Sequence, residues 1–205
     1  MSLARLLAEV RDCRLCESAL PHEPRPVVQA DARARILVAG QAPGRNVHAS
    51  GRPFDDVSGD VLRKWLGVTP EEFYDAARFA IVPMGLCYPG TGPGGDLPPR
   101  PECAPAWRER VLKQLPRVEL TLVIGRYALT YHIGGARRNV ADLAKDWRTY
   151  WPGMVPMPHP SPRNRLWLRR HPWFEAEVVP RIQARVRELL EADARLAGEA
   201  ARGHG

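Results

Sequence analysis

Residues 35–40 read Arg-Ile-Leu-Val-Ala-Gly, a short apolar run that ends at a glycine, and residues 120–125 repeat this form as Leu-Thr-Leu-Val-Ile-Gly. Continuous apolar runs of this length are typical of parallel strands that are buried on both faces. Two further strands are predicted, one at residues 79–84 and one at residues 154–157. Pro156 places the last of these at an edge of the sheet, because proline has no N–H to donate to a neighbouring strand.

Helical patterns lie between and after these strands. They cover residues 57–66, 105–115, 126–133 and 173–196. Strands that alternate with helices imply a parallel sheet with helices on both faces. We therefore predict an α/β fold, a single-domain three-layer α/β/α arrangement around a central, mainly parallel four-stranded sheet. In such sheets ligands bind beyond the carboxyl ends of the strands, so a site is expected in the loops that follow the strands.

The length of the chain limits the number of domains. At 205 residues with 44% hydrophobic side chains, it is long enough for one buried core and too short for two ordinary domains. We predict one domain over residues 1–196 and a disordered tail at 197–205, where the sequence fades into small and polar residues. The protein is expected to be a monomer.

The start of the chain and its charge bear on where the protein acts. Arg5 and Glu9 interrupt the first ten residues, which therefore lack the apolar run of a signal peptide, and no stretch is long and apolar enough to cross a bilayer. We expect a cytoplasmic protein with no membrane association. The net charge of +7 and the pI near 9.7 suit a polyanionic partner, although scattered arginines would also serve as solvated surface.

All four cysteines fall in a pattern typical of a metal site. Two residues separate Cys13 from Cys16, and Cys87 and Cys103 follow much later in the chain. A two-residue separation lets both thiolates reach one metal centre, so the set predicts a four-sulfur site that joins two parts of the domain. Residues 88–101, between the last two cysteines, are rich in glycine and proline and are not expected to form a regular element.

The loop after the first strand is rich in glycine and proline. Residues 40–44 read Gly-Gln-Ala-Pro-Gly, and residues 51–59 read Gly-Arg-Pro-Phe-Asp-Asp-Val-Ser-Gly. Such a loop can turn its backbone N–H groups toward a ligand, and Phe54 offers a flat apolar surface beside Asp55 and Asp56. Either aspartate would also cap the helix that follows, and taken alone the cap is the simpler interpretation.

The loop after the fourth strand reads Pro-His-Pro-Ser-Pro-Arg-Asn at residues 158–164. Its prolines restrict the backbone around His159 and hold the imidazole at the end of the strand. A single histidine is more often structural than catalytic. What favours a functional role is that both unusual loops follow strand ends, where this architecture builds its sites.

Together these loops resemble the motifs of the uracil-DNA glycosylase superfamily. Residues 40–44 are similar to its first motif, and residues 159–164 to its second, in the form of the single-strand-selective monofunctional enzymes. The cysteine spacing and residues 51–54 resemble the iron-sulfur branches called families four and five. The resemblance extends from about Leu6 to Asn164. It implies a monofunctional DNA glycosylase that flips uracil out of DNA, and a [4Fe-4S] cluster in a structural role on the four cysteines, with zinc as the alternative.

The resemblance also implies roles for individual residues. Phe54 would stack on the extruded base, and His159 would donate a hydrogen bond to its O2 atom as the glycosidic bond breaks. Contacts with the base are implied for Gly40, Gln41, Ala42 and Asn164, and contacts with the DNA for Ser161, Arg163 and Arg165.

Two carboxylates of the family pattern are missing. Family-four enzymes carry Glu where Gln41 stands, and family-one enzymes carry Asp where Ala42 stands. Residues 56–59, Asp-Val-Ser-Gly, are similar instead to a family-five motif. Asp56 is therefore the predicted catalytic carboxylate, and Asp55 is the second choice.

The same comparison bears on specificity and on competing functions. Related enzymes often carry Asn in the third strand, where this chain has Pro83, so hypoxanthine or xanthine is expected as a substrate beside uracil. The two motifs contain no lysine for a Schiff base, so no lyase step is expected. One alternative is a protein that binds or covalently traps damaged DNA without turnover, since both carboxylates are missing. Another is an iron-sulfur electron carrier, which would not need the His159 loop.

Overall fold

The computed structural model describes residues 2–134 and 138–202. At the centre of the described residues is a four-stranded sheet in the order β2-β1-β5-β6 with every neighbouring pair parallel. Its strands are β1 (Ile36–Ala39), β2 (Phe79–Ile81), β5 (Leu120–Ile124) and β6 (Met154–Met157). The predicted sheet is confirmed, including β6 at an edge. Strand β2 stops earlier than predicted, before Pro83, which cannot donate to a ladder.

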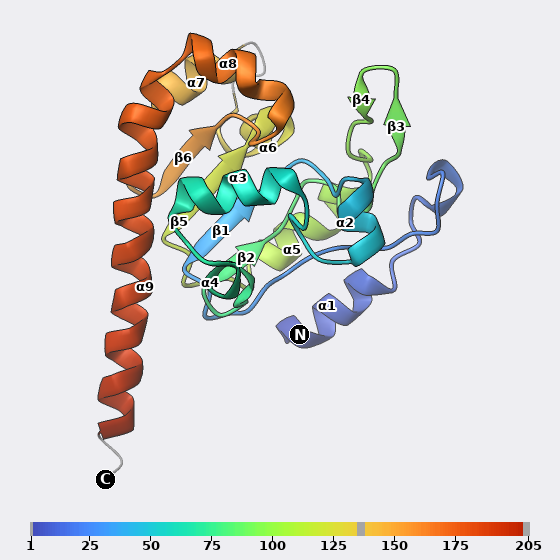
Figure 1. Ribbon diagram of the computed structural model, residues 1–205. Coiled ribbons are helices and arrows are strands. Elements are labelled where there is room, and N and C mark those ends of the chain that lie inside the picture. The colour runs from blue at the N-terminus through green and yellow to red at the C-terminus, as the bar shows by residue number, and fades with distance from the viewer. Residues whose placement is uncertain (1, 135–137, 203–205) are drawn as a thin grey trace.

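Helices cover both faces of this sheet (Figure 1). Alternate side chains of β1 point to opposite faces, so Ile36 and Val38 pack with one set of helices and Leu37 with the other. The first set is α3 (Val57–Leu66), α4 (Pro70–Tyr74) and α9 (Val179–Arg202). The second set is α1 (Leu3–Arg11), α5 (Glu109–Leu112), α6 (Gly125–His132) and α7 (Val140–Lys145). The three-layer α/β/α arrangement is as predicted.

The segment between Cys87 and Cys103 corrects one prediction. It was expected to form no regular element, but it contains a short antiparallel hairpin, β3 (Thr91–Gly92) and β4 (Gly95–Asp96), which projects from the body of the molecule in Figure 1. Gly95 has a φ of +116°, which glycine adopts at little cost and which lets the chain reverse. The glycines that suggested irregular structure therefore make a tight turn.

Two short helices complete the surroundings of the pocket described below. Helix α2 (Arg45–Ser50) follows β1, and helix α8 (Arg165–Arg170) follows β6. The predicted domain boundary at residue 196 falls within α9, whose backbone is described to Arg202, while residues 203–205 lie outside the described residues. The boundary and the disordered tail stay predictions. In the part of the chain that the structure describes, no helix is long and apolar enough to span a membrane.

A buried arginine fixes the end of β2. The side chain of Arg108 is 2% exposed, and its Nη1 donates to the carbonyl oxygens of Val82 at 2.6 Å and Pro83 at 3.1 Å. Its Nη2 is hydrogen-bonded to Nε2 of His132 on α6. Burial, together with the positive charge of Arg108, lowers the pKa of His132 to about 4. The imidazole is therefore neutral at pH 7 and accepts the arginine N–H.

This arrangement predicts an acid-sensitive fold. In the unfolded chain His132 has the ordinary pKa of 6.5. As the pH falls from 6.5 toward 4, His132 therefore becomes protonated in the unfolded state while it stays neutral in the folded state. The free energy of unfolding should fall by about 1 to 2 kcal/mol between about pH 7 and pH 5. Replacing His132 with glutamine, whose oxygen can still accept from Arg108, should remove most of this loss. Denaturant titrations at both pH values measure it, and equal pH dependence in the two proteins would contradict the assignment.

Candidate active site

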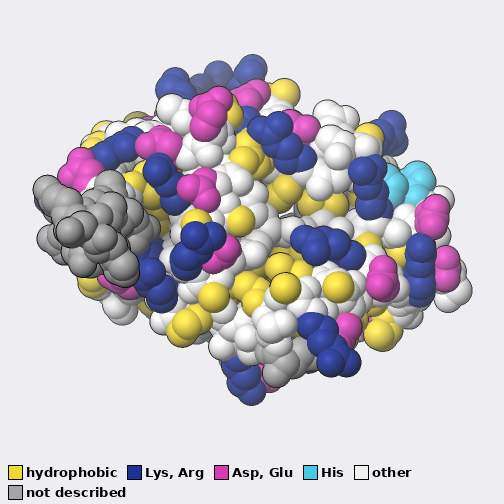
Figure 2. Space-filling model, turned by 90° about the horizontal axis from the view of Figure 1, so that it is seen from below, with side chains coloured by type: hydrophobic (Ala, Val, Ile, Leu, Met, Phe, Trp, Pro, Cys, Tyr) yellow, Lys and Arg dark blue, Asp and Glu magenta, His cyan; other side chains and the backbone are white. Residues whose placement is uncertain are grey.

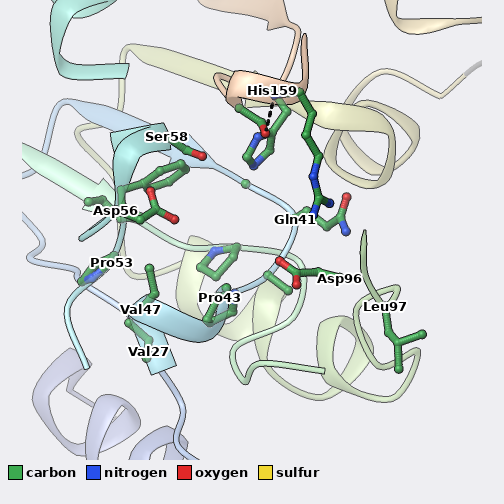
Figure 3. Close-up of a pocket in the computed structure, with 18 of the residues that line it drawn as sticks. Val27, Gln41, Pro43, Val47, Pro53, Asp56, Ser58, Asp96, Leu97 and His159 are labelled. Carbon is green, nitrogen blue, oxygen red and sulfur yellow. Dashed lines mark hydrogen bonds between the residues drawn. The ribbon is translucent and has the colours of Figure 1, made fainter. Parts of the chain in front are cut away.

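A cavity of about 400 Å³ opens at the carboxyl ends of β1, β2 and β6 (Figure 3). Its walls come from the loops that the sequence singled out, and the hairpin β3–β4 adds a further side. The polar and aromatic lining residues include Gln41, Phe54, Asp56, Ser58, Asp96, His159, Ser161 and Arg163. The predicted loops therefore converge on one site, at the edge of the sheet where ligands bind in this architecture.

The loop after β1 presents backbone donors to this cavity. The carbonyl oxygens of Gly40 and Gln41 accept hydrogen bonds from the N–H groups of Met84 and Gly85, both at 2.9 Å. In a planar trans peptide the C=O and the next N–H point in opposite directions, so the N–H groups of Gln41 and Ala42 point away from that neighbouring segment. Among the described residues, no backbone carbonyl accepts from either group. Both can donate to a ligand oxygen.

Phe54 is held in a strained backbone conformation. Its φ of +53° is unfavourable for a bulky side chain. Its carbonyl oxygen accepts from Nη1 of Arg63 and from the hydroxyl of Tyr74, each at 3.2 Å, and a side chain at Gly59 would collide with that oxygen. These contacts aim the ring at Gly40, where a Cβ would lie 3.4 Å from Cζ of Phe54. The strain thus places an aromatic face in the cavity.

Asp56 has two functions in the structure. It is the N-cap of α3, and its Oδ1 accepts from the N–H of Gly59 at 2.9 Å, so the capping interpretation is confirmed. It also lines the cavity, whereas Asp55 is exposed and does not. The cap occupies one carboxylate oxygen, and Oδ2 stays available on the cavity side.

His159 stands at the end of β6 and lines the cavity. Burial lowers its pKa below the ordinary 6.5, and the carboxylates of Asp56 and Asp96 partly oppose that effect. The imidazole is therefore mainly neutral at pH 7 and can donate one N–H. Asn164 does not line the cavity; its Nδ2 donates to the carbonyl oxygen of His159 at 2.7 Å. Asn164 thus braces the histidine.

The two arginines of the second motif loop and the start of α8 differ in whether they line the cavity. Arg163 and Ser161 line the cavity, and Oγ of Ser161 accepts from the N–H of Arg163 at 3.3 Å. Arg165 begins α8 and lies outside the lining. On the face shown in Figure 2, Lys and Arg side chains alternate with Asp and Glu. The net charge of +7 therefore does not form a patch of one sign on that face.

Sequence reasoning missed Asp96 and Leu97, which line the cavity from the hairpin β3–β4. No local motif marks them, because they lie in the glycine- and proline-rich segment. The indirect signal was the pair Cys87 and Cys103 on either side of that segment, since a metal group bound to both would restrict where its middle can lie.

The four cysteines line a second, smaller cavity. All are free thiols, and apolar neighbours including Leu86 and Trp107 enclose them. Within the described residues, no three His, Cys, Asp or Glu side chains form a group that could hold a metal ion. The thiols thus surround a common space without meeting at one point.

The protein directs N–H groups at two of the four sulfurs. Cys103 accepts from the N–H of Leu86 at 3.3 Å, and Cys13 accepts from Nε1 of Trp107 at 3.2 Å. Burial raises the pKa of the Cys87 thiol to about 12 and that of Cys103 to about 11. Such donors are typical of the surroundings of thiolate ligands, whose protons a metal displaces.

A sequence comparison identifies the family. The family model described as "Uracil DNA glycosylase superfamily" matches residues 27–183, which include every element of the central sheet. The chain belongs to the uracil DNA glycosylase superfamily. The predicted family is confirmed, and the cavity occupies the position at which the two motifs meet.

Two relatives carry the name type-4 uracil-DNA glycosylase. The protein from Sulfurisphaera tokodaii is 25% identical over 154 residues, which are 70% of this chain and 64% of that protein. The protein from Saccharolobus solfataricus is 28% identical over 136 residues, which are 60% of this chain and 55% of that protein. The alignments thus span less than two thirds of either relative.

Proposed function

We propose that this superfamily member is a monofunctional DNA glycosylase that takes uracil and other deaminated bases out of DNA and hydrolyses the N-glycosidic bond. The observation that carries the proposal is the convergence, in one cavity, of the Phe54 ring, the N–H groups of Gln41 and Ala42, and the His159 imidazole. Together they offer a stacking surface for a base and donors for its oxygens. The names of the two relatives point to the same activity.

The side chains of the cavity can stabilise the charges that develop on the base and on the sugar during the reaction. Breaking the glycosidic bond leaves negative charge on the base and positive charge on the sugar, and a preorganised site stabilises both. His159 donates to the base O2, and Asp56 faces the sugar. Among the described residues that line the cavity none is a lysine, and we propose an abasic site without strand cleavage as the product.

The base is read mainly by the backbone. Pro83 lines the cavity but has no side-chain donor or acceptor, and Arg108 already occupies the carbonyl oxygens of Val82 and Pro83. Each carbonyl oxygen keeps a second lone pair, but no side chain at this position can read the N3–H that distinguishes uracil from cytosine. This supports a substrate range that extends beyond uracil to hypoxanthine or xanthine.

Oligonucleotides bearing uracil, hypoxanthine or xanthine, in single- and double-stranded form, test the function. After incubation and alkali treatment we expect strand breaks at uracil and at one or more of the purines. DNA that stays intact throughout would refute the glycosylase. A protein–DNA adduct on a denaturing gel would show a trapping protein instead.

Replacing Asp56 with asparagine tests the carboxylate. Asparagine is also a good N-cap, so α3 should keep its stability while the negative charge is lost. The single-turnover rate of base release should fall roughly 10- to 100-fold. The same change at Asp55, which lies outside the cavity, should have the smaller effect. If Asp55→Asn slowed the reaction more, the two assignments would be reversed.

The four cysteines suit a [4Fe-4S] cluster better than zinc. A single zinc ion needs all four sulfurs about 2.3 Å from one point, whereas in a cluster each sulfur bonds a different iron atom and the sulfurs stay farther apart. The four thiols line one common cavity, as the second arrangement requires. The cluster would supply a structural link between the start of the chain and the residues that follow β2.

DNA would approach the mouth of the cavity beside α8. Ser161, Arg163 and Arg165 would contact phosphates there, and Leu166 is 50% exposed. An exposed apolar side chain at this position can fill the gap that an extruded base leaves. The monomeric state and the cytoplasmic location stay predictions.

A further inference from the structure

The hairpin β3–β4 carries a carboxylate into the cavity. Asp96, the last residue of β4, lines it together with His159 and Asp56. One contact holds the hairpin there, and a second distance shows how near it lies to the first motif loop. The guanidinium of Arg163 packs on Gly95 in the space that any other residue's side chain would fill, and Oδ2 of Asp96 lies 3.5 Å from where a Cβ of Gly44 would be. Asp96 is thus held between the two motif loops.

Asp96 and Asp56 face each other across Gly44. The same Cβ position at Gly44 lies 3.8 Å from Oδ2 of Asp56, so the two oxygens are separated by no more than the sum of these distances. In Figure 3 Asp96 lies on the side of Gln41, and Asp56 lies on the opposite side. The cavity therefore has a carboxylate on each side.

The two carboxylates differ in what they can still bind. Oδ1 of Asp56 is committed to the N–H of Gly59 at 2.9 Å. The hydrogen bond that Asp96 accepts, from Oγ1 of Thr91, is long at 3.5 Å. A carboxylate with weak protein contacts keeps its lone pairs for water, which is what a general base requires.

The negative charge of Asp96 is expected to weaken the binding of DNA. An extruded base enters the cavity while its sugar and phosphates stay at the mouth, where the exposed Asp96 stands. A negative charge at that point repels phosphates and weakens binding. Any favourable contribution of Asp96 would therefore come from chemistry at the sugar and not from affinity for phosphates, which the net charge of +7 supports instead.

We propose that Asp96 is a second catalytic carboxylate, which accepts the proton of the water that attacks the sugar. This inference rests on the glycosylase function proposed above. The C1′–N bond breaks with its electron pair leaving on the base, where His159 stabilises it. The water oxygen then bonds to C1′, and the water proton passes to Asp96 and on to solvent. Asp56 stabilises the positive charge on the sugar in the same step.

Single-turnover excision and DNA binding by Asp96→Asn test the proposal. We expect base release to slow roughly 100-fold, and binding to uracil-containing DNA to be unchanged or tighter, because a repulsive charge is gone. Asp96→Glu, which keeps the charge, should recover at least a tenth of the wild-type rate. Glu191→Gln on α9 removes the same charge away from the cavity and should change neither quantity.

The outcomes separate this inference from the function it rests on. If the wild type releases bases and Asp96→Asn does so within threefold of it, the role of Asp96 is wrong and the glycosylase stands. If Asp96→Asn loses activity and DNA binding together, the residue is structural and the role is again wrong. If the wild type releases no base, both proposals fall.

Discussion

Replacing His159 with alanine is expected to slow single-turnover release of uracil roughly 100- to 1000-fold. The imidazole is held at the end of β6 by Asn164, and burial keeps it mainly neutral, so its N–H can stabilise the negative charge that develops on the departing base. Binding of DNA that carries a non-hydrolysable uracil nucleotide should change little. The comparison of the two measurements assigns the loss to the chemical step.

His159→Gln and the pH profile sharpen this test. Glutamine keeps an N–H donor and should recover part of the lost rate. Because burial lowers the pKa of His159 below 6.5, the wild-type rate should vary little between about pH 7 and 8. An alanine variant with the wild-type rate, or a wild-type rate that drops steadily as the pH rises through 7, would show that a neutral His159 is not the donor.

Replacing Cys87 with serine is expected to remove the visible absorbance of the cluster and to lower the melting temperature by roughly 10 °C or more. Cys87 lies two residues after Gly85, in the segment whose N–H groups hold Gly40 and Gln41, and a cluster on Cys87 and Cys103 would fix both ends of the segment that carries Asp96. Loss of the cluster should therefore also reduce excision, although no cysteine lines the active-site cavity among the described residues.

Trp107→Phe is the matched control for the cysteine variant. It keeps an aromatic ring beside the four cysteines but removes the N–H that Trp107 donates to Cys13. It should retain iron, absorbance and a melting temperature close to that of the wild type. If Cys87→Ser kept its absorbance and stability, or if the wild type carried stoichiometric zinc and no iron, the cluster assignment would be wrong.

The sheet could be predicted because its strands are continuous apolar runs, a pattern that burial on both faces demands. Helix α3 could also be predicted, since Asp56 at its start and Gly67 at its end are strong local signals. The hairpin β3–β4 could not. Its strands are two residues long, and the contact that Gly95 makes with Arg163 comes from a distant part of the sequence.

The position of the site could be predicted from the sequence more readily than the residues that line its cavity. Both motif loops follow strands, so their convergence follows from the topology. Two adjacent side chains of one loop can differ in whether they reach the cavity. Asp56 lines it and also caps α3, whereas Asp55 does not line it. Asn164 matched the motif yet bonds the backbone of His159, whereas Asp96 matched no motif and lines the cavity.

The most direct measurement of the central proposal is the release of free base. Wild-type protein in excess over DNA with a single uracil is incubated, and free uracil and abasic sites are both counted. The account predicts one molecule of free uracil for each abasic site, with the strand unbroken until alkali is added. Uracil that stays in the DNA, or DNA that becomes covalently attached to the protein without release of uracil, would contradict it.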